Sequence, residues 1–240
     1  MCFTVNVNLV REELEDRYGA TLIDPDKYRP SYYYQAHALP ELPVLGSGFP
    51  GQIRLLKWGL IPSWTKSMED ASEIRIKTFN ARSESISSKP SFSASFKSRR
   101  CIVPVRGFYE WQHVGKEKIP WYIYRADGAL MSLAGLYDEW VESKSGETFT
   151  TFTVITTDAN QLMAEIHNTK KRMPAILEKE MEADWLNPSF SLTDAGEILK
   201  PSPVETIRAH TIGPLITSRT ADRNTPDIIK PWNYSQPSLF

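Results

Sequence analysis

Residues 101–124 read CIVPVRGFYEWQHVGKEKIPWYIY, and this stretch decides the fold class. Three of its segments, 101–105, 108–113 and 121–124, carry the alternating or β-branched apolar residues that are typical of strands. Gly115 supplies the turn between the last two segments. Closely spaced strands joined by short turns predict a meander-like sheet of mainly antiparallel strands.

The strand pattern continues on both sides of this stretch. Further strands are expected at 2–8, 52–58, 129–137 and 148–157. The later strands are separated by the turn signals Asp127-Gly128 and Ser145-Gly146. The segment 28–50, which is rich in aromatic residues and proline, is expected to be mostly irregular.

Helices are expected mainly after the strands. Their predicted ranges are 10–18, 159–167, 178–186 and 193–200, with Gly19 ending the first and Asp158 and Gln161 spaced as a capping pair at the second. Strands in runs with appended helices favour an α+β fold over a doubly wound one. We therefore expect one domain, residues 1–237, with a mainly antiparallel, strongly curved or barrel-like sheet surrounded by helices, and a tail at 238–240.

The composition limits the classes of function. Of the 240 residues, 41% are hydrophobic and 24% are charged, which is enough to bury a sizeable core. The formal net charge of -1 excludes a protein that coats nucleic acid through a global positive field, so a nucleic-acid site must be local. Three basic clusters are candidates, although each alone is more typical of a solvated charged face: Lys97, Arg99 and Arg100; Lys170, Lys171 and Arg172; Arg219 and Arg223.

Cysteine and histidine usage argues against disulfides and metals. Cys2 and Cys101 are the only cysteines and the four histidines are scattered, so we expect a reducing compartment, no metal and no cofactor. The start of the chain lacks the features of a secretory signal, and no apolar run approaches about 18 residues. We expect a cytoplasmic or nucleoid-associated protein that does not enter membranes.

The segment 46–51, GSGFPG, matches the letters of a dinucleotide-binding fingerprint. A strand pattern follows it and Pro50 lies inside it, whereas a phosphate-binding loop needs the start of a helix at this point. The segment is therefore expected to be a turn.

Cys2 has a chemical option that an internal cysteine lacks. Removal of Met1 would place a free α-amine and a thiol on one residue, with reference pKa values of about 7.7–8.0 and about 8.5. Such an aminothiol condenses with an aldehyde to a Schiff base, and the sulfur then closes a thiazolidine ring. For a cysteine at this position in an arbitrary protein, a buried strand residue is the more common role.

Five short motifs occur in a fixed order: Met1-Cys2, WGLIPSW at 58–64, NARSE at 80–84, GFYEW at 107–111, and Ile166-His167 leading to Arg172-Met173-Pro174. Together they resemble the SOS response-associated peptidase family, whose members form protein crosslinks to abasic sites in DNA. The resemblance runs from Cys2 to about Leu177, with a weaker match through Ser218-Arg219. Each motif alone is weak, but five in this order are specific.

The resemblance implies a role for each matching residue. Cys2 corresponds to the nucleophile that holds the ring-opened sugar as a thiazolidine, and Asn80 to the residue that positions the terminal amine and the sugar. Arg82 corresponds to a phosphate clamp, for which a planar donor fork is suited. Glu110 corresponds to the proton shuttle, and His167 to the residue that assists opening of the sugar ring.

Local chemistry supports some of these roles and adds others. The aromatic neighbours of Glu110 are expected to desolvate its carboxyl group and raise its pKa. Trp64 is expected either to stack on an unpaired base or to pack in the core, and Arg172 is expected to bind DNA. A base platform formed by the tyrosines at 32–34 is less expected than their packing in the core.

The chain departs from the common family pattern in three places. Phe3-Thr4 follows Cys2 where many members have Gly-Arg, and residues 35–38, QAHA, stand where Asn-Val-Ala-Pro is common. Four residues separate His167 from Arg172, which makes this spacer longer and more basic than the compact form of the motif. These departures affect expected contacts to DNA and remove no predicted catalytic group.

The expected function is therefore to sense abasic sites in single-stranded DNA and to shield them through a covalent link. The family resemblance also implies autoproteolytic removal of Met1, and weak lyase activity through the Schiff base is possible chemistry. We expect a monomer, and the sequence identifies no protein partner. Two alternatives stay open: an N-terminal-nucleophile cysteine amidohydrolase, in which the amine is the base for the thiol, and a non-enzymatic DNA-binding module with an inert Cys2.

Overall fold

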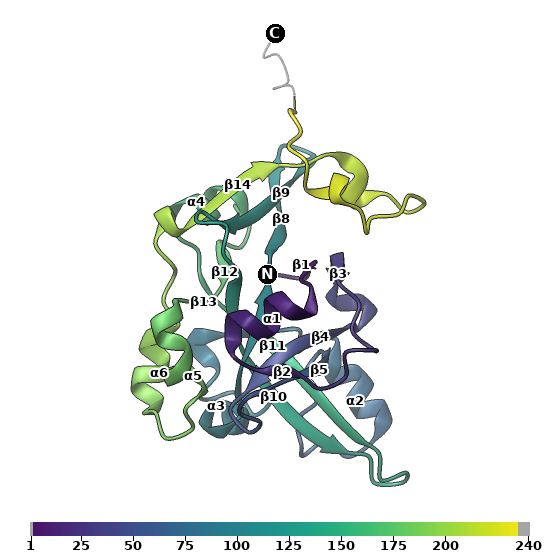
Figure 1. Cartoon of the computed structure of the whole chain (residues 1–240), viewed down its shortest axis with the longest axis vertical. Coiled ribbons are helices and arrows are strands. Elements are labelled where there is room, and N and C mark those ends of the chain that lie inside the picture. Colours follow the sequence, from purple (N-terminus) through teal and green to yellow (C-terminus); the bar gives the residue numbers. More distant parts are fainter. Residues whose placement is uncertain (1, 235–240) are drawn as a thin grey trace.

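The computed structural model describes residues 2–234. The predicted tail at 238–240 and the last residues of the predicted domain lie outside the described residues. Two sheets form the framework. The α+β prediction is confirmed, and the helices and 3₁₀ turns lie around these sheets (Figure 1).

Five strands of the larger sheet close into a barrel. Around the ring they are β10 (Met131–Val141), β11 (Thr148–Asp158), β5 (Gln52–Trp58), β4 (Glu41–Gly46) and β7 (Arg100–Val105). All neighbours are antiparallel except β11 and β5, which pair in parallel and close the ring. The expected barrel-like sheet is therefore confirmed, with one parallel seam.

Four short strands extend this barrel: β2 (Thr21–Leu22), β6 (Asn80–Arg82), β12 (Arg172–Pro174) and β13 (Ile176–Leu177). Strand β6 pairs in parallel with β11, next to the point where β5 pairs with it. Strand β12 pairs with the other edge of the same part of β11. Two predicted motif regions are thus brought to β11 from different parts of the chain.

The second sheet is antiparallel throughout. Its strands, in spatial order, are β14 (Ile207–Thr211), β9 (Glu117–Arg125), β8 (Gly107–Val114), β1 (Thr4–Val7) and β3 (Ser31–Gln35). Because β1 lies between β8 and β3, the start of the chain is tied down by hydrogen bonds on both sides. The predicted terminal strand is confirmed, although it begins at Thr4, and it places Cys2 two residues before a central strand.

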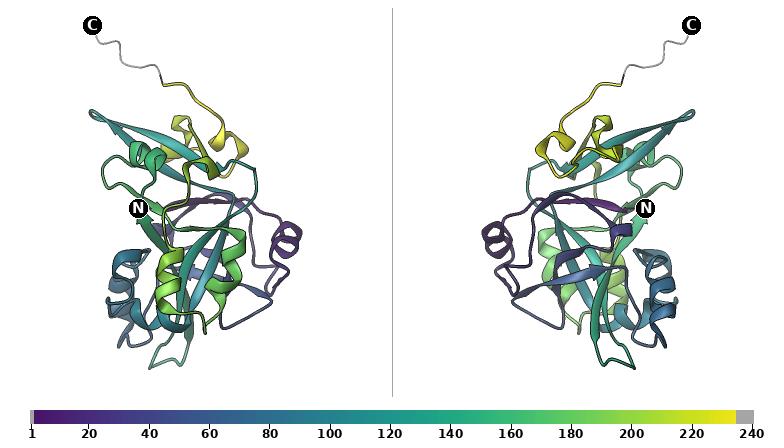
Figure 2. Two further views of the ribbon diagram at one scale, coloured as in Figure 1. Left: turned by 90° about the vertical axis from the view of Figure 1, so that its left-hand side faces the viewer. Right: turned by 90° about the vertical axis from the view of Figure 1, so that its right-hand side faces the viewer.

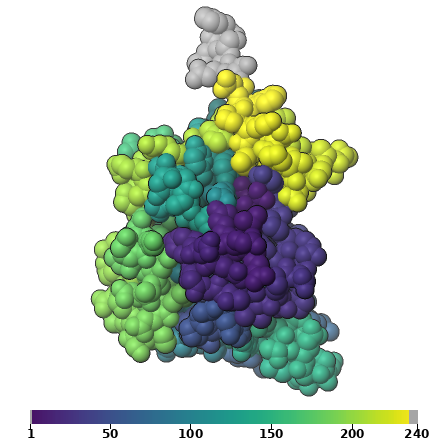
Figure 3. Space-filling model, in the orientation of Figure 1, coloured from purple at the N-terminus to yellow at the C-terminus, as the bar shows by residue number. Residues whose placement is uncertain are grey.

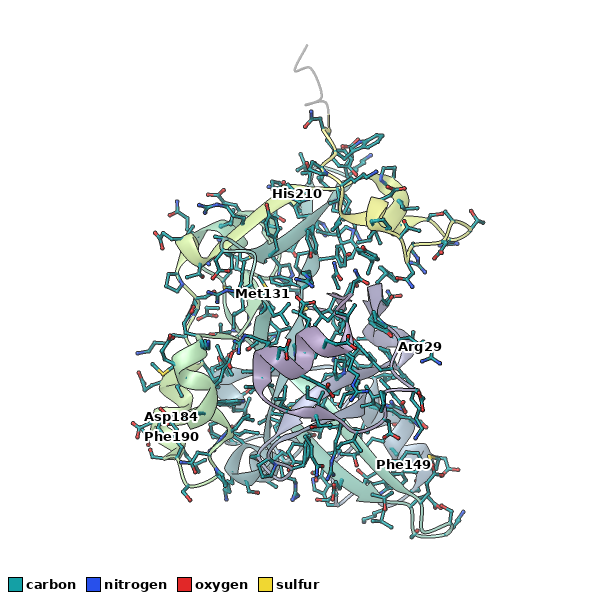
Figure 4. All side chains as sticks on the ribbon, viewed as in Figure 1. Arg29, Met131, Phe149, Asp184, Phe190 and His210 are labelled. Carbon is teal, nitrogen blue, oxygen red and sulfur yellow. The ribbon has the colours of Figure 1, made fainter. Side chains whose placement is uncertain are left out.

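Within residues 2–234, six α-helices lie on the outside of the sheets: α1 (Arg11–Tyr18), α2 (Met68–Arg75), α3 (Ser93–Ser98), α4 (Gln161–Ile166), α5 (Glu182–Leu186) and α6 (Leu192–Ile198). The helices α1 and α2 lie on opposite sides of the molecule (Figure 2). Phe149 on β11 and His210 on β14 mark opposite ends of the molecule (Figure 4). None of the helices described is long and apolar enough to cross a membrane.

Among the described residues, the core has one large apolar cluster, a smaller one of aromatic and aliphatic residues, and a third, very small one around Trp140. The large cluster fills the barrel and the space between the barrel and the second sheet, and it includes Trp58 and Trp185. The smaller cluster joins Tyr109 and Tyr122 of the second sheet to Ile216 and Ile228 near the C-terminus. This second cluster fixes the C-terminal segment beside the strand that carries Glu110.

Some local predictions were wrong. The segment 28–50 contains β3 and β4 rather than mostly irregular structure, because both strands obtain their partners from distant parts of the chain. The helix expected at 159–167 begins after Asn160, whose side chain accepts a hydrogen bond from Met163 N at 2.9 Å. Asp158 instead ends β11 and pairs with Arg172. The turn predicted at 46–51 is confirmed and joins β4 to β5.

Candidate active site

Cys2 is held in place by contacts from three directions. Asn80 Nδ2 donates a hydrogen bond to the Cys2 carbonyl oxygen at 2.9 Å, and the backbone nitrogen of Ala36 donates to the Phe3 carbonyl oxygen at 2.8 Å. Thr4 begins the pairing of β1 with β3. Asn80 reaches Cys2 because β6 lies alongside β11, and the predicted role of Asn80 in positioning the terminal amine and the sugar stays a prediction.

The other polar atom of Asn80 is also positioned for binding. Its Oδ1 is buried and has no hydrogen-bond partner among residues 2–234. A buried acceptor without a partner is costly and is common where a ligand or a reacting group completes the site. Asn80 can therefore hold the Cys2 carbonyl through Nδ2 and accept a hydrogen bond through Oδ1.

The Cys2 thiol is fully buried. Burial raises its pKa well above the ordinary value, and the nearby negative charge of Glu110 raises it further. The sulfur lies 4.0 Å from the Thr4 carbonyl oxygen, to which the thiol can donate weakly. A raised pKa favours the protonated thiol over the thiolate, so a nearby base is needed to activate the sulfur.

Glu110 lies on β8 and is paired with Trp121 across the hairpin. Only 4% of the residue is exposed. This burial raises the pKa of Glu110 to about 7, while a hydrogen bond from the Trp111 backbone acts in the opposite direction. The predicted rise is confirmed, and a carboxyl group with this pKa can both give and take a proton at neutral pH.

His167 follows the last residue of α4 and is also buried. Its Nδ1 lies 2.8 Å from the Arg172 carbonyl oxygen, which can only accept, so Nδ1 carries the hydrogen. Burial lowers the pKa of His167, which favours the neutral ring with Nε2 as a proton acceptor. Residues 168–171, the spacer between His167 and Arg172, form a turn. It is closed by a 2.8 Å hydrogen bond from Lys171 N to the His167 carbonyl oxygen, with Lys171 at φ 50°.

Glu110 and His167 face the same cavity, which has a volume of about 570 Å³. Its lining comes from Phe3 just before β1, from β3, β8 and β9, from the segment after α4 and from the C-terminal segment. The charged side chains besides Glu110 are cations: Lys118, Lys170 and Arg223. An anionic substrate would therefore meet a positive rim and a proton-transfer pair within the cavity.

Asn80 and Arg82 face a second cavity of about 470 Å³. All of its charged lining residues are cations, and they are Lys77, Arg82 and Lys89. Phe3 lines both cavities and so forms their boundary, next to Cys2. Two positively charged cavities therefore meet beside the candidate nucleophile.

The Phe3 ring is held by two other rings. It packs against His37 at a centroid distance of 5.3 Å and against Phe79, edge to face, at 6.2 Å. His37 and Phe79 also contact each other, with centroids 5.1 Å apart. Phe3 and His37, two of the departures from the common family pattern, are thus neighbours in space whose rings pack against each other.

The sequence model of the SOS response associated peptidase (SRAP) family matches residues 1–219. The chain belongs to this family. Abasic site processing protein YoqW of Bacillus subtilis is 37% identical over 206 residues, which cover 85% of this chain and 87% of that protein. Abasic site processing protein HMCES of Xenopus tropicalis is 36% identical over 233 residues, covering 85% of this chain and 67% of that protein.

A solved structure of a protein from Bacteroides thetaiotaomicron has the same fold. It superimposes with a TM-score of 0.91 at 39% sequence identity and covers 97% of this chain and all of that one. A protein from Bordetella bronchiseptica shares the fold at 24% identity, with a TM-score of 0.76. This chain therefore shares the barrel and the antiparallel sheet with these two solved structures.

Trp64 and Arg172, the other two residues predicted to bind DNA, have different surroundings. Trp64 is 52% exposed, which excludes the core-packing alternative, and its Nε1 donates to the Pro90 carbonyl oxygen at 3.2 Å. Arg172 is buried, and its guanidinium donates to Glu84, Asp158 and the Thr156 carbonyl oxygen. These contacts give Arg172 a structural role, and the structure offers no support for the prediction that it binds DNA.

The three basic clusters of the sequence have different roles in the structure. Arg100 is buried and donates to the carbonyl oxygens of Phe96 and Trp185, and Arg99 pairs with Asp138 at 3.0 Å, so the first cluster is largely structural. Lys170 of the second cluster and Arg223 of the third line the larger cavity. Sequence reasoning did not single out Lys118, because the strand predicted at 121–124 begins at Glu117 in the structure, and this earlier start pairs Lys118 with His113.

Proposed function

We propose that this SRAP-family protein processes abasic sites in single-stranded DNA by forming a thiazolidine between Cys2 and the lesion. The observation that carries the proposal is the meeting of Cys2 and Asn80 with Glu110 and His167 at the junction of two positively charged cavities. Relatives that are 36% and 37% identical to this chain over the aligned residues are named abasic site processing proteins. The chemistry requires Cys2 to be the first residue, so removal of Met1 comes first.

Removal of Met1 is an amide hydrolysis. The products are free methionine and a chain with an amine on Cys2, and one water is consumed. The Cys2 thiol lies next to the bond that is cut, and Glu110 is the buried carboxyl group whose charge acts on that thiol. We propose that the site performs this step on itself, with Glu110 as the proton acceptor for the sulfur.

The crosslink forms in two bond-making steps. The Cys2 nitrogen bonds to C1′ of the ring-opened sugar, and the aldehyde oxygen leaves as water after proton transfer. The sulfur then bonds to the same carbon while its proton passes to nitrogen, so one aldehyde and one aminothiol give one thiazolidine and one water. The raised pKa of Glu110 suits both proton transfers, because its acid form protonates the departing oxygen and its carboxylate accepts the thiol proton.

The remaining residues of the site hold the sugar and its strand. His167 accepts the hydroxyl proton of the closed sugar through Nε2 and so assists ring opening. Asn80 holds the Cys2 carbonyl and offers Oδ1 to the terminal amine. Arg82 binds a neighbouring phosphate, and exposed Trp64 provides a face for an unpaired base.

Single strands are favoured as the substrate. The two cavities are separated by Phe3, so a strand that occupies both must turn at this ring, and an unpaired backbone does this more readily than a duplex. Cations around both cavities supply the local positive charge that a chain of net charge -1 needs for DNA binding. The Schiff base also permits slow β-elimination, which is the proposed weak lyase activity, and we propose that the protein acts as a monomer.

The test is incubation with a single-stranded oligonucleotide that carries one abasic site, followed by denaturing electrophoresis. A heat-stable shifted band is expected with the intact protein and none with Cys2→Ala. An amidohydrolase with an N-terminal nucleophile would instead turn over an amide and give no band. A binding module with an inert Cys2 would bind the oligonucleotide equally well with and without Cys2→Ala and would also give no band.

A further inference from the structure

The C-terminal segment, residues 212–234, forms a strap across the second sheet. It contains two 3₁₀ turns, η5 (Pro214–Thr217) and η6 (Pro226–Ile229), and most of it lies beyond residue 219, where the match to the family model ends. Figure 3 shows this segment in yellow lying against the purple N-terminal part of the chain. The strap therefore covers the region around β3, and the part of it after residue 219 lies outside the match to the family model.

The strap is fixed at both of its turns. Ile216 of η5 and Ile228 of η6 are buried in the cluster that contains Tyr109, the residue before Glu110. Between the turns, Asn224 Oδ1 accepts a hydrogen bond from Tyr32 N at 2.9 Å. The Tyr32 carbonyl in turn accepts from the Tyr109 hydroxyl at 2.6 Å. Residue 223 is thus held at a defined place beside β3.

Arg223 uses this position to lie over Tyr33. Its guanidinium carbon is 4.2 Å from the centre of the Tyr33 ring, and Nη1 donates to the Tyr33 hydroxyl at 2.9 Å. Within residues 2–234, no carboxylate lies within ion-pair distance of Arg223. A guanidinium that rests on an aromatic face keeps its edge donors and its charge available, and this geometry suits a phosphate group.

The position of Arg223 relative to the reaction site points to its ligand. Arg223 lines the cavity that contains Glu110 and His167, whereas Arg82 lines the other cavity, beyond Phe3. A strand that places its lesion beside Cys2 has a phosphate on each side of the missing base. One arginine per cavity therefore matches one backbone phosphate on each side.

We propose that Arg223, positioned by Tyr33, is a second phosphate-binding residue that holds the DNA strand on the Glu110 side of the lesion. The inference deepens the proposed function and rests on it for the path of the strand. It assigns to the strap a role in DNA binding, with Arg223 as the contact and Tyr33 as the residue that orients it.

The test measures equilibrium binding of an undamaged single-stranded oligonucleotide by fluorescence anisotropy over a range of salt concentrations. Because this oligonucleotide has no aldehyde, the result does not depend on crosslinking. The variants are Arg223→Ala, Arg223→Lys and Tyr33→Phe. Arg208→Ala is the matched control, since Arg208 is an exposed arginine on β14 of the same sheet and does not line either cavity.

Arg223→Ala is expected to weaken binding by about three- to tenfold near physiological salt, and to reduce the slope of log K against log salt by about 0.7. Arg223→Lys should restore the slope but only part of the affinity, because lysine keeps the charge and loses the planar fork. Tyr33→Phe keeps the ring and should cost less than Arg223→Ala. Arg208→Ala should change neither quantity.

The inference is overturned if Arg223→Ala and Arg208→Ala have the same affinity and salt slope as the unchanged protein, with unfolding temperatures showing that all variants are folded. It is also overturned if Arg223→Ala weakens binding without changing the slope, because a phosphate contact must release counterions. Failure of the proposed function looks different: no crosslink with an abasic oligonucleotide, while Arg223→Ala still reduces affinity and slope for the undamaged strand.

Discussion

Asn80 Nδ2 donates a 2.9 Å hydrogen bond to the Cys2 carbonyl oxygen across 78 positions of sequence. The bond connects Cys2, two residues before β1, to β6, a strand that pairs with the edge of β11. Two parts of the fold thus meet at the residue whose amine and thiol are proposed to react. The position of Cys2 is set by this junction rather than by the chain terminus alone.

Replacing Asn80 tests whether this bond positions the nucleophile. Asn80→Ala removes the donor to the Cys2 carbonyl and the buried Oδ1, so crosslinking should slow by about ten- to a hundredfold, the equivalent of about 1–3 kcal/mol. Single-turnover crosslinking rates on denaturing gels measure the effect. A rate within about twofold of the unchanged protein, with folding intact, would remove Asn80 from the mechanism.

Glu110 should make stability depend on pH. Its pKa is raised from 4.5 to about 7 by folding, so its stabilising contribution is complete below about pH 4.5 and is lost as the pH rises through about 7. Over this pH range the contribution of Glu110 to the free energy of unfolding falls by about 3 kcal/mol. Glu110→Gln should therefore gain stability relative to the unchanged protein between these pH values, as measured by denaturant unfolding at several pH values.

The same variant should also lose the pH dependence of crosslinking near neutrality, because a glutamine cannot exchange a proton. Glu139→Gln, which changes an exposed carboxylate on β10, is the control. It should preserve the pH dependence of stability and the pH dependence of the crosslinking rate. A crosslinking rate whose pH profile is identical in Glu110→Gln and the unchanged protein would show that another group transfers the proton.

His167 is proposed to act on ring opening, and this step can be bypassed. His167→Ala should slow crosslinking to a natural abasic site, which is mostly a closed ring, by about a hundredfold. With an oligonucleotide that carries an acyclic aldehyde, the same variant should react within a fewfold of the unchanged protein. Equal slowing with both substrates would mean that His167 instead maintains the loop through its hydrogen bond to the Arg172 carbonyl.

The two arginines that the sequence analysis predicts to bind DNA, Arg82 and Arg172, should behave differently. Arg82→Ala should weaken binding to single-stranded DNA and reduce the salt slope by about 0.7, because Arg82 lines a cavity without acidic residues. Arg172→Ala should leave the slope unchanged and lower the free energy of unfolding by about 1–3 kcal/mol, because Arg172 is buried and bridges Glu84 and Asp158. If Arg172→Ala instead reduces the salt slope and leaves the free energy of unfolding unchanged, Arg172 contacts DNA.

The strands of the central meander and the raised pKa of Glu110 could be predicted because both depend on neighbours in sequence. The β8–β9 hairpin follows from alternating residues and a glycine turn, and the desolvation of Glu110 follows in part from Tyr109 and Trp111. The terminal strand could also be recognised, and with it the placement of Cys2. Motif order was enough to predict the family.

Features that depend on distant contacts could not be predicted. The parallel pairing of β5 with β11 closes the barrel without any local sequence signal. The contact of Phe3 with His37, the boundary between two cavities, and the placement of Arg223 over Tyr33 require the whole fold. Arg172 lay in a basic run, which describes charge but not the carboxylates that Glu84 and Asp158 bring from other segments.

The central claim is that Cys2, once it is the first residue, forms a thiazolidine with the abasic sugar. The most direct measurement is the intact mass of the adduct with a single-stranded abasic oligonucleotide, before and after borohydride treatment. We predict the mass of the protein without Met1 plus that of the oligonucleotide, less one water, with no change on reduction. An adduct that retains Met1, or one that gains two hydrogens and also forms with Cys2→Ala, would contradict the account.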